Sequence, residues 1–157
     1  MTRLWGRSPQ GERVVDRVPH GHWCSTTMIS SIRSDGSTAC MTLEGSTTGE
    51  AFKAYVQHIL VPSLRPGDIV VLDNLSSHKN QEAKEMIQKA GGEVRFLPPY
   101  SPDLNPIEKM WSKVKASLRA TKARTQETLL QAIGHALNQV TPQDAVGWFT
   151  SCGYSFN

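Results

Sequence analysis

The sequence has 157 residues, about the length of one domain, and can bury a substantial hydrophobic core. Its 17 Lys and Arg residues against 14 Asp and Glu residues give a formal net charge of +3, so binding of a polyanion would depend on how these charges are distributed. Three widely spaced cysteines without CxxC spacing argue against a disulfide framework and a zinc knuckle. No apolar run approaches ~20 residues and the start lacks the apolar stretch of a signal peptide, so we expect a soluble cytoplasmic protein with no membrane partner.

The first elements predicted along the chain are a basic segment and a hairpin. Residues 1–22 are polar and basic, are interrupted by Gly and Pro, and resemble a strand only at 13–18. Two stretches rich in β-branched and small residues follow, at 24–34 and 37–45, on either side of the turn signal Asp35-Gly36. This pattern predicts two antiparallel strands joined by a short turn.

The middle of the chain alternates between helical and strand patterns. Apolar residues spaced by three and four predict a helix over 49–64, closed by Pro66-Gly67. Residues 69–72 form an uninterrupted apolar run, typical of a strand that is covered on both faces. A helix over 79–90 stops at Gly91-Gly92, and the short strand EVRFL follows at 93–97.

The last third of the chain is helical after a proline-rich loop. One helix begins at Pro106, and a helix pair lies between 125 and 149. The order of elements predicts an α/β fold with a mixed central sheet flanked by helices. We divide the chain into a basic N-terminal segment (1–22), an α/β core (23–120) and a C-terminal helical extension (121–157). The buried stripe expected for 125–140 is Leu129, Leu130, Ile133 and Leu137.

Asp73 is the first candidate catalytic residue. It directly follows the apolar strand of residues 69–72, at the open end where α/β sheets present reactive groups. Asn74, Ser77 and His78 come immediately after it and make a dense polar cluster. The competing interpretation is ordinary turn chemistry, with Ser77 as the N-cap of the next helix.

Glu108 is the second candidate, and its structural alternative is stronger. Asn105 is a favourable N-cap, Pro106 suits the first helical position, and Glu108 stands at the third. A glutamate there can reach back to the N–H of the cap residue in a capping box. The four prolines around it, at 98, 99, 102 and 106, would in either case hold Glu108 with little freedom.

Two stretches of the chain carry a family resemblance. VVLDNLSSHKN and FLPPYSPDLNPIEKMW, with 34 residues between Asp73 and Glu108, resemble the catalytic domain of DDE transposases of the bacterial insertion-sequence branch of the mariner superfamily. A looser similarity extends over almost the whole chain and includes GEAFKAYVQHILVPSLRPGDIVVLDN.

The resemblance implies a fold, a site and partners. The fold would be RNase H-like, and Asp73 and Glu108 would be catalytic carboxylates that hold Mg²⁺ or Mn²⁺ in a two-metal site. Asn74, His78 and Asn105 would support them. The reaction would be phosphodiester hydrolysis and strand transfer on DNA, at transposon ends and target DNA, with no small-molecule substrate. Relatives also lead us to expect a homodimer in the bacterial cytoplasm, associated with the nucleoid.

The chain also departs from the pattern of the family that it resembles. Relatives begin with an Asp at the end of the first strand of the sheet, upstream of a segment like MTRLWGRSPQGER, and this chain starts at that segment. We therefore expect the first strand and the first carboxylate to be missing, because Asp16, Asp35 and Asp68 do not match the motif. Strand cleavage by this polypeptide alone should then be weak or absent. The alternative function is a non-catalytic DNA-binding or oligomerisation remnant of a transposase.

Basic residues are candidates for contacts with DNA. Six of them and no acidic residue lie between Lys109 and Arg124, although such a stripe can also be a solvated helix face. His20 and His22 have an HxH spacing found in metal sites, but loop or strand-edge histidines are the favoured interpretation. The residues that we select for DNA binding are Lys115, Arg119, Lys79, Arg3 and Arg7.

Overall fold

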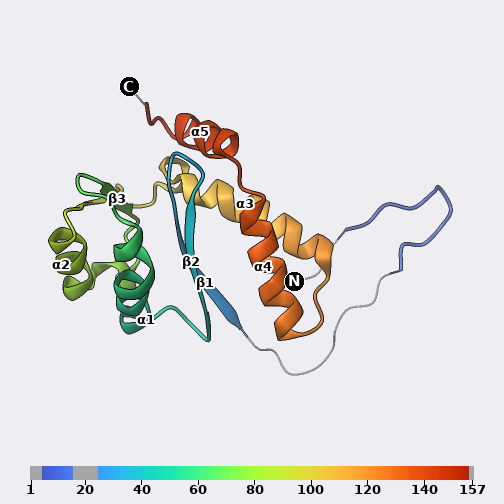
Figure 1. The fold of residues 1–157 in the computed structure, drawn as a ribbon. Coiled ribbons are helices and arrows are strands. Elements are labelled where there is room, and N and C mark those ends of the chain that lie inside the picture. Colours follow the sequence, from blue (N-terminus) through green and yellow to red (C-terminus); the bar gives the residue numbers. More distant parts are fainter. Residues whose placement is uncertain (1–4, 16–24, 156–157) are drawn as a thin grey trace.

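A β-hairpin stands at the centre of the computed structural model, which describes residues 5–15 and 25–155 (Figure 1). Strand β1 (Thr26–Ile32) pairs antiparallel with β2 (Thr38–Glu44), as the sequence predicts. In the turn, Asp35 accepts hydrogen bonds from the N–H and the hydroxyl of Ser37, and Gly36 has a φ of +85° that favours glycine.

The helix predicted over 49–64 is present, but its last turns change type. Helix α1 (Gly49–Tyr55) starts at Thr48, whose side chain accepts from the N–H of Ala51. It continues as the π-helical turn η1 (Val56–Leu60) and the 3₁₀ turn η2 (Val61–Ser63). Pro62 lacks an N–H and its ring would clash with the preceding turn of a regular α-helix, so the backbone widens before it.

Strand β3 (Ile69–Leu72) and strand β4 (Glu93–Phe96) form a parallel pair. The connection between them contains the 3₁₀ turn η3 (Ser76–Lys79) and helix α2 (Gln81–Lys89). The N-cap of α2 is Asn80, whose Oδ1 accepts from the N–H of Ala83 at 3.0 Å. The interpretation of Ser77 as the N-cap was therefore wrong.

Three helices complete the chain, in agreement with the sequence pattern. Helix α3 (Pro106–Thr121) follows the 3₁₀ turn η4 (Pro102–Leu104). Helices α4 (Gln126–Asn138) and α5 (Pro142–Ser151) start at Thr125 and Thr141, and both have a capping box. No helix in the described part of the chain is long and apolar enough to cross a membrane.

The hairpin separates two hydrophobic cores, because alternate side chains of a strand point to opposite faces. Ile29 belongs to the first core, with buried residues of α1, η1 and α2. Met28 and Ile32 pack on the second, which α3 and α4 form. The prediction for α4 was correct for Ile133 but wrong for Leu130, which is 41% exposed. The fully buried large side chains of the two cores are Phe52, Val56, Ile87, Met110 and Val114.

The predicted single mixed sheet is not what the described residues form. The hairpin and the β3–β4 pair are two separate two-stranded sheets, although the α/β class is confirmed. The prediction that β3 is covered on both faces was also wrong, since Ile69 is 50% and Val71 is 39% exposed. Only the face with Val70 and Leu72 packs on the first core. An apolar run indicates that burial of both faces of a strand would be favourable, but it does not show that another element packs on both faces.

Candidate functional site

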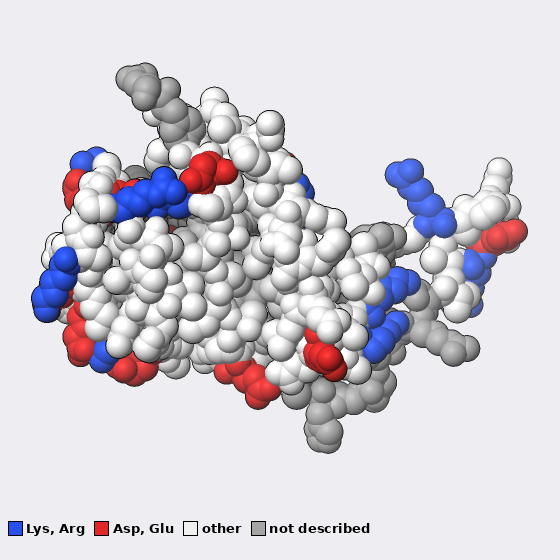
Figure 2. Space-filling model, viewed as in Figure 1, with Lys and Arg blue, Asp and Glu red and all other residues white. Residues whose placement is uncertain are grey.

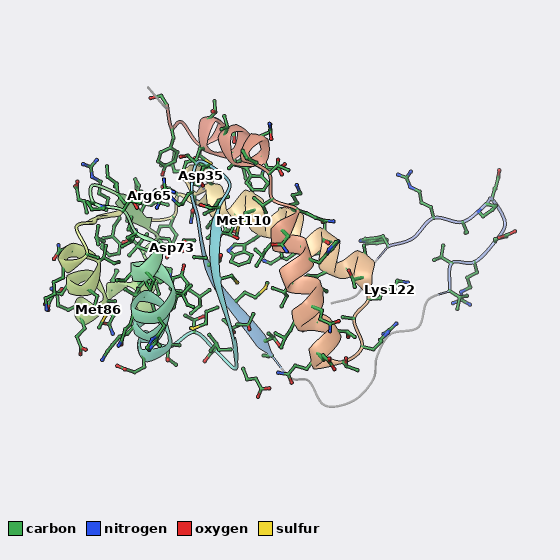
Figure 3. All side chains as sticks on the ribbon, viewed as in Figure 1. Asp35, Arg65, Asp73, Met86, Met110 and Lys122 are labelled. Atoms are coloured by element: carbon green, nitrogen blue, oxygen red, sulfur yellow. The ribbon has the colours of Figure 1, made fainter. Side chains whose placement is uncertain are left out.

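Asp73 lies at the carboxyl end of β3, on the side of the molecule that holds α1 and α2 (Figure 3). Its carboxylate oxygen Oδ1 accepts a hydrogen bond of 2.9 Å from the N–H of Leu75. That bond is the turn chemistry weighed as an alternative, and it uses only one oxygen. The side chain remains 45% exposed, so the second oxygen is accessible to a ligand.

His78 is the second residue in contact with the Asp73 carboxylate. Its Nδ1 lies 2.7 Å from Oδ1 of Asp73, without the alignment of a hydrogen bond. The imidazole ring packs on Phe52, with the ring centroids 4.5 Å apart. Asn74 turns away from the carboxylate, and its Nδ2 donates to the carbonyl of Leu97 at 2.5 Å. His78 therefore contacts Asp73 directly, whereas Asn74 links the end of β3 to the end of β4.

Glu108 lies in the first turn of α3 and is exposed. Asn105 is the N-cap of this helix by backbone conformation, with φ −107° and ψ 101°, but its side chain makes no capping hydrogen bond. The predicted capping box is therefore absent, and the N–H of Glu108 donates only to the carbonyl of Asn105 at 3.2 Å. The carboxylate of Glu108 has no recorded partner among the described residues and is accessible to a ligand.

Asp73 and Glu108 open onto one cavity of about 730 Å³. Asn105 and His78 line the same cavity, so four of the predicted site residues are accessible from one space. The cavity lies between β1 and β3, and its remaining walls are largely apolar. The apolar lining includes Ile29, Phe52, Val71, Ile107, Trp111 and Phe149.

A third carboxylate, Asp68, also lines the cavity but is already engaged. Its two oxygens accept from Nη1 and Nη2 of Arg33 at 2.6 and 2.7 Å, and Oδ2 also accepts from the N–H of Arg65 at 2.7 Å. The guanidinium holds the pKa of Asp68 at about 2. Because Asp68 precedes β3 and Asp73 follows it, they lie roughly 16 Å apart along an extended strand.

The other nearby carboxylates do not complete the site. Asp35 is used by Ser37 in the hairpin turn, and these hydrogen bonds lower its pKa. Asp16 lies outside the described residues, as do His20 and His22. Within residues 5–15 and 25–155 no three His, Cys, Asp or Glu side chains cluster in a way that could hold a metal ion.

The donor set tests the fit for a divalent cation. Asp73 and Glu108 offer hard carboxylate oxygens, which suit Mg²⁺ or Mn²⁺, and both side chains are accessible from one cavity. Two carboxylates are fewer than a two-metal site needs. The described residues therefore fit such a site in part.

None of the predicted DNA-binding residues that the structure describes lines the cavity. Lys115 and Arg119 are on α3, which leads toward Lys122 on the far side of the molecule from Asp73 (Figure 3). Lys79 is exposed at the end of η3. Arg7 is exposed on segment 5–15, which extends away from the helices, and Arg3 lies outside the described residues (Figure 1).

One lysine of the basic stripe has a structural role instead. Nζ of Lys113 donates to the carbonyl of Gln139 at 2.8 Å and to the carboxylate of Asp144 at 2.5 Å, so it fastens α3 to the start of α5. Figure 2 shows that the face over the hairpin and α4 carries few charged side chains, which are gathered at its margins. A polyanion would therefore not bind through the middle of that face.

Arg33 and Arg95 also line the cavity, and the sequence pattern did not single them out. Arg33 is bound to Asp68, while Arg95 pairs with Glu93 at 2.8 Å. Their positions within two predicted strands, at 24–34 and 93–97, were the only signals available. An isolated arginine gives no local pattern from which its partner can be read.

Comparison with known proteins adds one match. A family described as DDE superfamily endonuclease matches residues 1–130. No curated protein matches the chain. The match includes Asp73, Glu108 and every element from β1 to α3.

Proposed function

The chain belongs to the DDE superfamily endonucleases, and from this membership we propose that it is part of a transposase catalytic domain of the bacterial insertion-sequence type. The observation that supports this function best is that Asp73 and Glu108, from different elements, open onto one cavity. The proposed fold is RNase H-like, and the proposed partners are transposon-end and target DNA, bound by a homodimer at the bacterial nucleoid.

Each residue has a role in this proposal. Asp73, at the end of a rigid strand, and Glu108, in the first turn of a helix, would hold Mg²⁺ or Mn²⁺. When bound, such ions supply an activated nucleophile and stabilise the leaving oxygen at phosphorus. His78 limits the rotation of the Asp73 carboxylate from one side. Lys115 and Arg119 would hold the DNA backbone without reading its sequence.

A second candidate function rests on the count of carboxylates. With two accessible acidic ligands in the described part of the cavity, the chain alone would have weak or no cleavage activity. The same fold and basic residues would then serve as a non-catalytic DNA-binding or oligomerisation remnant. The two functions differ in whether Asp73 and Glu108 bind a cation.

Titration with Mn²⁺, followed by the loss of its free electron paramagnetic resonance signal, separates these functions. For the catalytic function we expect saturable binding that Asp73→Asn and Glu108→Gln each weaken at least tenfold. Glu127→Gln is the matched control, because Glu127 is exposed in the first turn of α4, outside the cavity. Equal binding by all four proteins would rule out the catalytic function and favour the remnant.

A further inference from the structure

Tyr100 combines two features that are each unfavourable in a folded protein. Its φ of +56° lies in the left-handed region, which favours glycine and is costly for a bulky side chain. Its ring is also fully exposed, and its side chain has no hydrogen bond or ring contact with another described residue. The protein therefore holds this ring in place without a packing contact that offsets the strain.

Lys122 is the other non-glycine residue with a positive φ in the described part of the chain, and its conformation has an ordinary explanation. It is the C-cap of α3, and its N–H donates to the carbonyl of Leu118, as is common where a helix ends in the left-handed region. Tyr100 ends no helix. It follows Pro99 in a turn, where glycine or asparagine would adopt the positive φ more readily.

The chain on both sides of Tyr100 is stiff. Pro98 and Pro99 fix their own φ angles, and Pro102 restricts the backbone of Ser101. The hydroxyl of Ser101 also donates to the carbonyl of Pro99 at 3.2 Å. Because the loop is already restricted, it loses little conformational freedom when a ligand covers the ring.

The loop that carries Tyr100 is linked to the loop that carries Asp73. Tyr100 lies three residues after Leu97, which is about 11 Å at most along the chain. The carbonyl of Leu97 accepts from Nδ2 of Asn74, and its N–H donates to the carbonyl of Leu72 at 2.8 Å. Tyr100 and Asp73 therefore belong to the same edge, where the carboxyl ends of the parallel strands β3 and β4 meet.

Other exposed apolar side chains and two lysines share this edge. Leu75, shortly after β3, is 49% exposed, and Phe96, the last residue of β4, is 37% exposed. Nζ of Lys84 lies 5.1 Å from the centre of the Phe96 ring, and Lys79 is exposed at the end of η3. Neither lysine forms an ion pair with a described residue. Aromatic rings combined with such cations are typical of surfaces that bind single-stranded nucleic acid.

We propose that Tyr100 is a stacking site for an unpaired DNA base beside the site of cleavage, with Lys79 and Lys84 near the neighbouring phosphates. A base outside the double helix exposes a π-face that can stack on tyrosine, whereas a base inside the duplex is covered by its neighbours. The choice of DNA as the ligand rests on the proposed function. The inference adds the state of that DNA, which is unpaired next to Asp73.

A protein partner fits this surface less well. Lysine is depleted in protein interfaces, and here Lys79 and Lys84 accompany the exposed rings. Asp103, on the same loop as Tyr100, is exposed and would repel a phosphate. We therefore assign the phosphates to the side of η3 and α2, which carry the two lysines.

The test uses a single DNA strand of about eight bases, with a fluorescent label at its end and 2-aminopurine at its centre. Anisotropy measures binding and the loss of 2-aminopurine fluorescence measures stacking, both in EDTA. The same strand annealed to its complement is the duplex control. The full chain is compared with Tyr100→Asn, Tyr100→Phe and Trp5→Asn. Trp5 is the matched control because it is 89% exposed but lies on segment 5–15.

We expect Tyr100→Asn to weaken binding of the single strand at least fivefold and to abolish the stacking signal, because base stacking on an aromatic ring contributes about this factor or more. Tyr100→Phe and Trp5→Asn should bind within about twofold of the unsubstituted chain. Duplex binding should be the same in all four proteins. Tyr100→Asn should unfold at the same temperature or a higher one, because asparagine tolerates a positive φ and no packing contact is lost.

Several results would overturn the proposal. One is that the unsubstituted chain gives no stacking signal, or that Tyr100→Asn binds the single strand equally well. An equal loss in Tyr100→Phe would assign the effect to the hydroxyl group, and an equal loss in Trp5→Asn would show that any exposed aromatic side chain suffices. A lower unfolding temperature for Tyr100→Asn would show that the ring stabilises the loop instead.

The same measurements separate this proposal from the proposed function. Because they are made in EDTA, they do not depend on a cation at Asp73 and Glu108. A stacking signal in a chain that binds no Mn²⁺ would support the Tyr100 site and rule out the catalytic function. Binding of Mn²⁺ without a stacking signal would leave the catalytic function in place and rule out the Tyr100 site.

Discussion

Arg33 and Asp68 join the two sheets of the molecule through a two-fold hydrogen-bonded ion pair of 2.6 and 2.7 Å. The pair links the residue after β1 to the residue before β3, and both side chains are mostly buried, at 26% and 20% exposure. Such a forked geometry is stronger than a single contact between surface charges. It is a direct polar link between the end of β1 and the start of β3.

This pair predicts a loss of stability in acid. The pKa of Asp68 is about 2 in the folded protein, below its ordinary value of 3.8, so the unfolded state binds more protons as the pH falls between these values. The stabilisation is complete above pH ~5 and disappears toward pH 2, and it amounts to about 2 kcal/mol. Urea unfolding of Asp68→Asn should show that loss at pH 7 and a smaller further loss in acid.

The control for Asp68 is Glu93→Gln. Glu93 also has a lowered pKa through Arg95, but both side chains of that pair are more than half exposed. We expect a much smaller change for this surface pair, because solvent screens charges that are exposed. Equal losses in the two variants would mean that the Arg33–Asp68 pair does not hold the sheets together.

Gly36 predicts a second effect on stability, through the contact between the hairpin turn and α5. A Cβ atom at Gly36 would lie 2.9 Å from backbone atoms of Thr141 and Pro142. Gly45 has nearly the same φ, +87° against +85°, but open space around it. Both alanine variants should lose about 1 kcal/mol to backbone strain, and Gly36→Ala a further 1–3 kcal/mol to overpacking. Thermal unfolding that gives equal losses would contradict the contact.

Substitution of Lys113 should change stability, whereas substitution of Lys115 should change DNA binding. Lys115→Ala and Arg119→Ala should each weaken binding to a 20-base-pair duplex, with a slope of log affinity against log salt that is smaller by about 1. Lys113→Ala should keep the slope and lose about 1 kcal/mol of stability, because it removes two hydrogen bonds to Gln139 and Asp144. Fluorescence anisotropy at several salt concentrations measures the slopes. An equal fall in slope for Lys113→Ala would count against this assignment.

Substitutions of His78 should distinguish its packing on Phe52 from its contribution to cation binding. In His78→Phe the contact with Phe52 is retained and the contact with Asp73 is lost, so stability should stay within about 1 kcal/mol while Mn²⁺ affinity falls tenfold or more. His78→Ala should lose both. Calorimetric titration with Mn²⁺ that finds His78→Phe equal to the unsubstituted protein would show that His78 has only a packing role.

Local sequence patterns predicted most elements, because turn and capping chemistry acts between neighbouring residues. Asp35-Gly36 predicted the hairpin turn, and Asn105-Pro106 predicted the start of α3. The pattern failed where the answer depends on distant residues. Nothing in residues 69–72 shows whether another element covers Val71, and nothing in the spacing of Arg33 and Asp68 shows that they meet.

The residues of the candidate site could be predicted from the sequence, but their surroundings could not. Spacing and family resemblance selected Asp73 and Glu108, and the two side chains do open onto one cavity. Their role as metal ligands stays a prediction. The capping-box alternative for Glu108 was wrong, because a capping motif describes a preference of short segments and the side chain of Asn105 does not engage.

The two cores on either side of the hairpin make the alignment of β1 with β2 unusually well determined. Ile29 faces one core while Met28 and Ile32 face the other. A slip of one residue would turn every side chain of β1 to the opposite face and remove correct packing from both cores together. Misaligned hairpins would therefore not be stabilised by packing against either core. The pairing between residues 26 and 44 would then determine how the rest of the molecule is arranged.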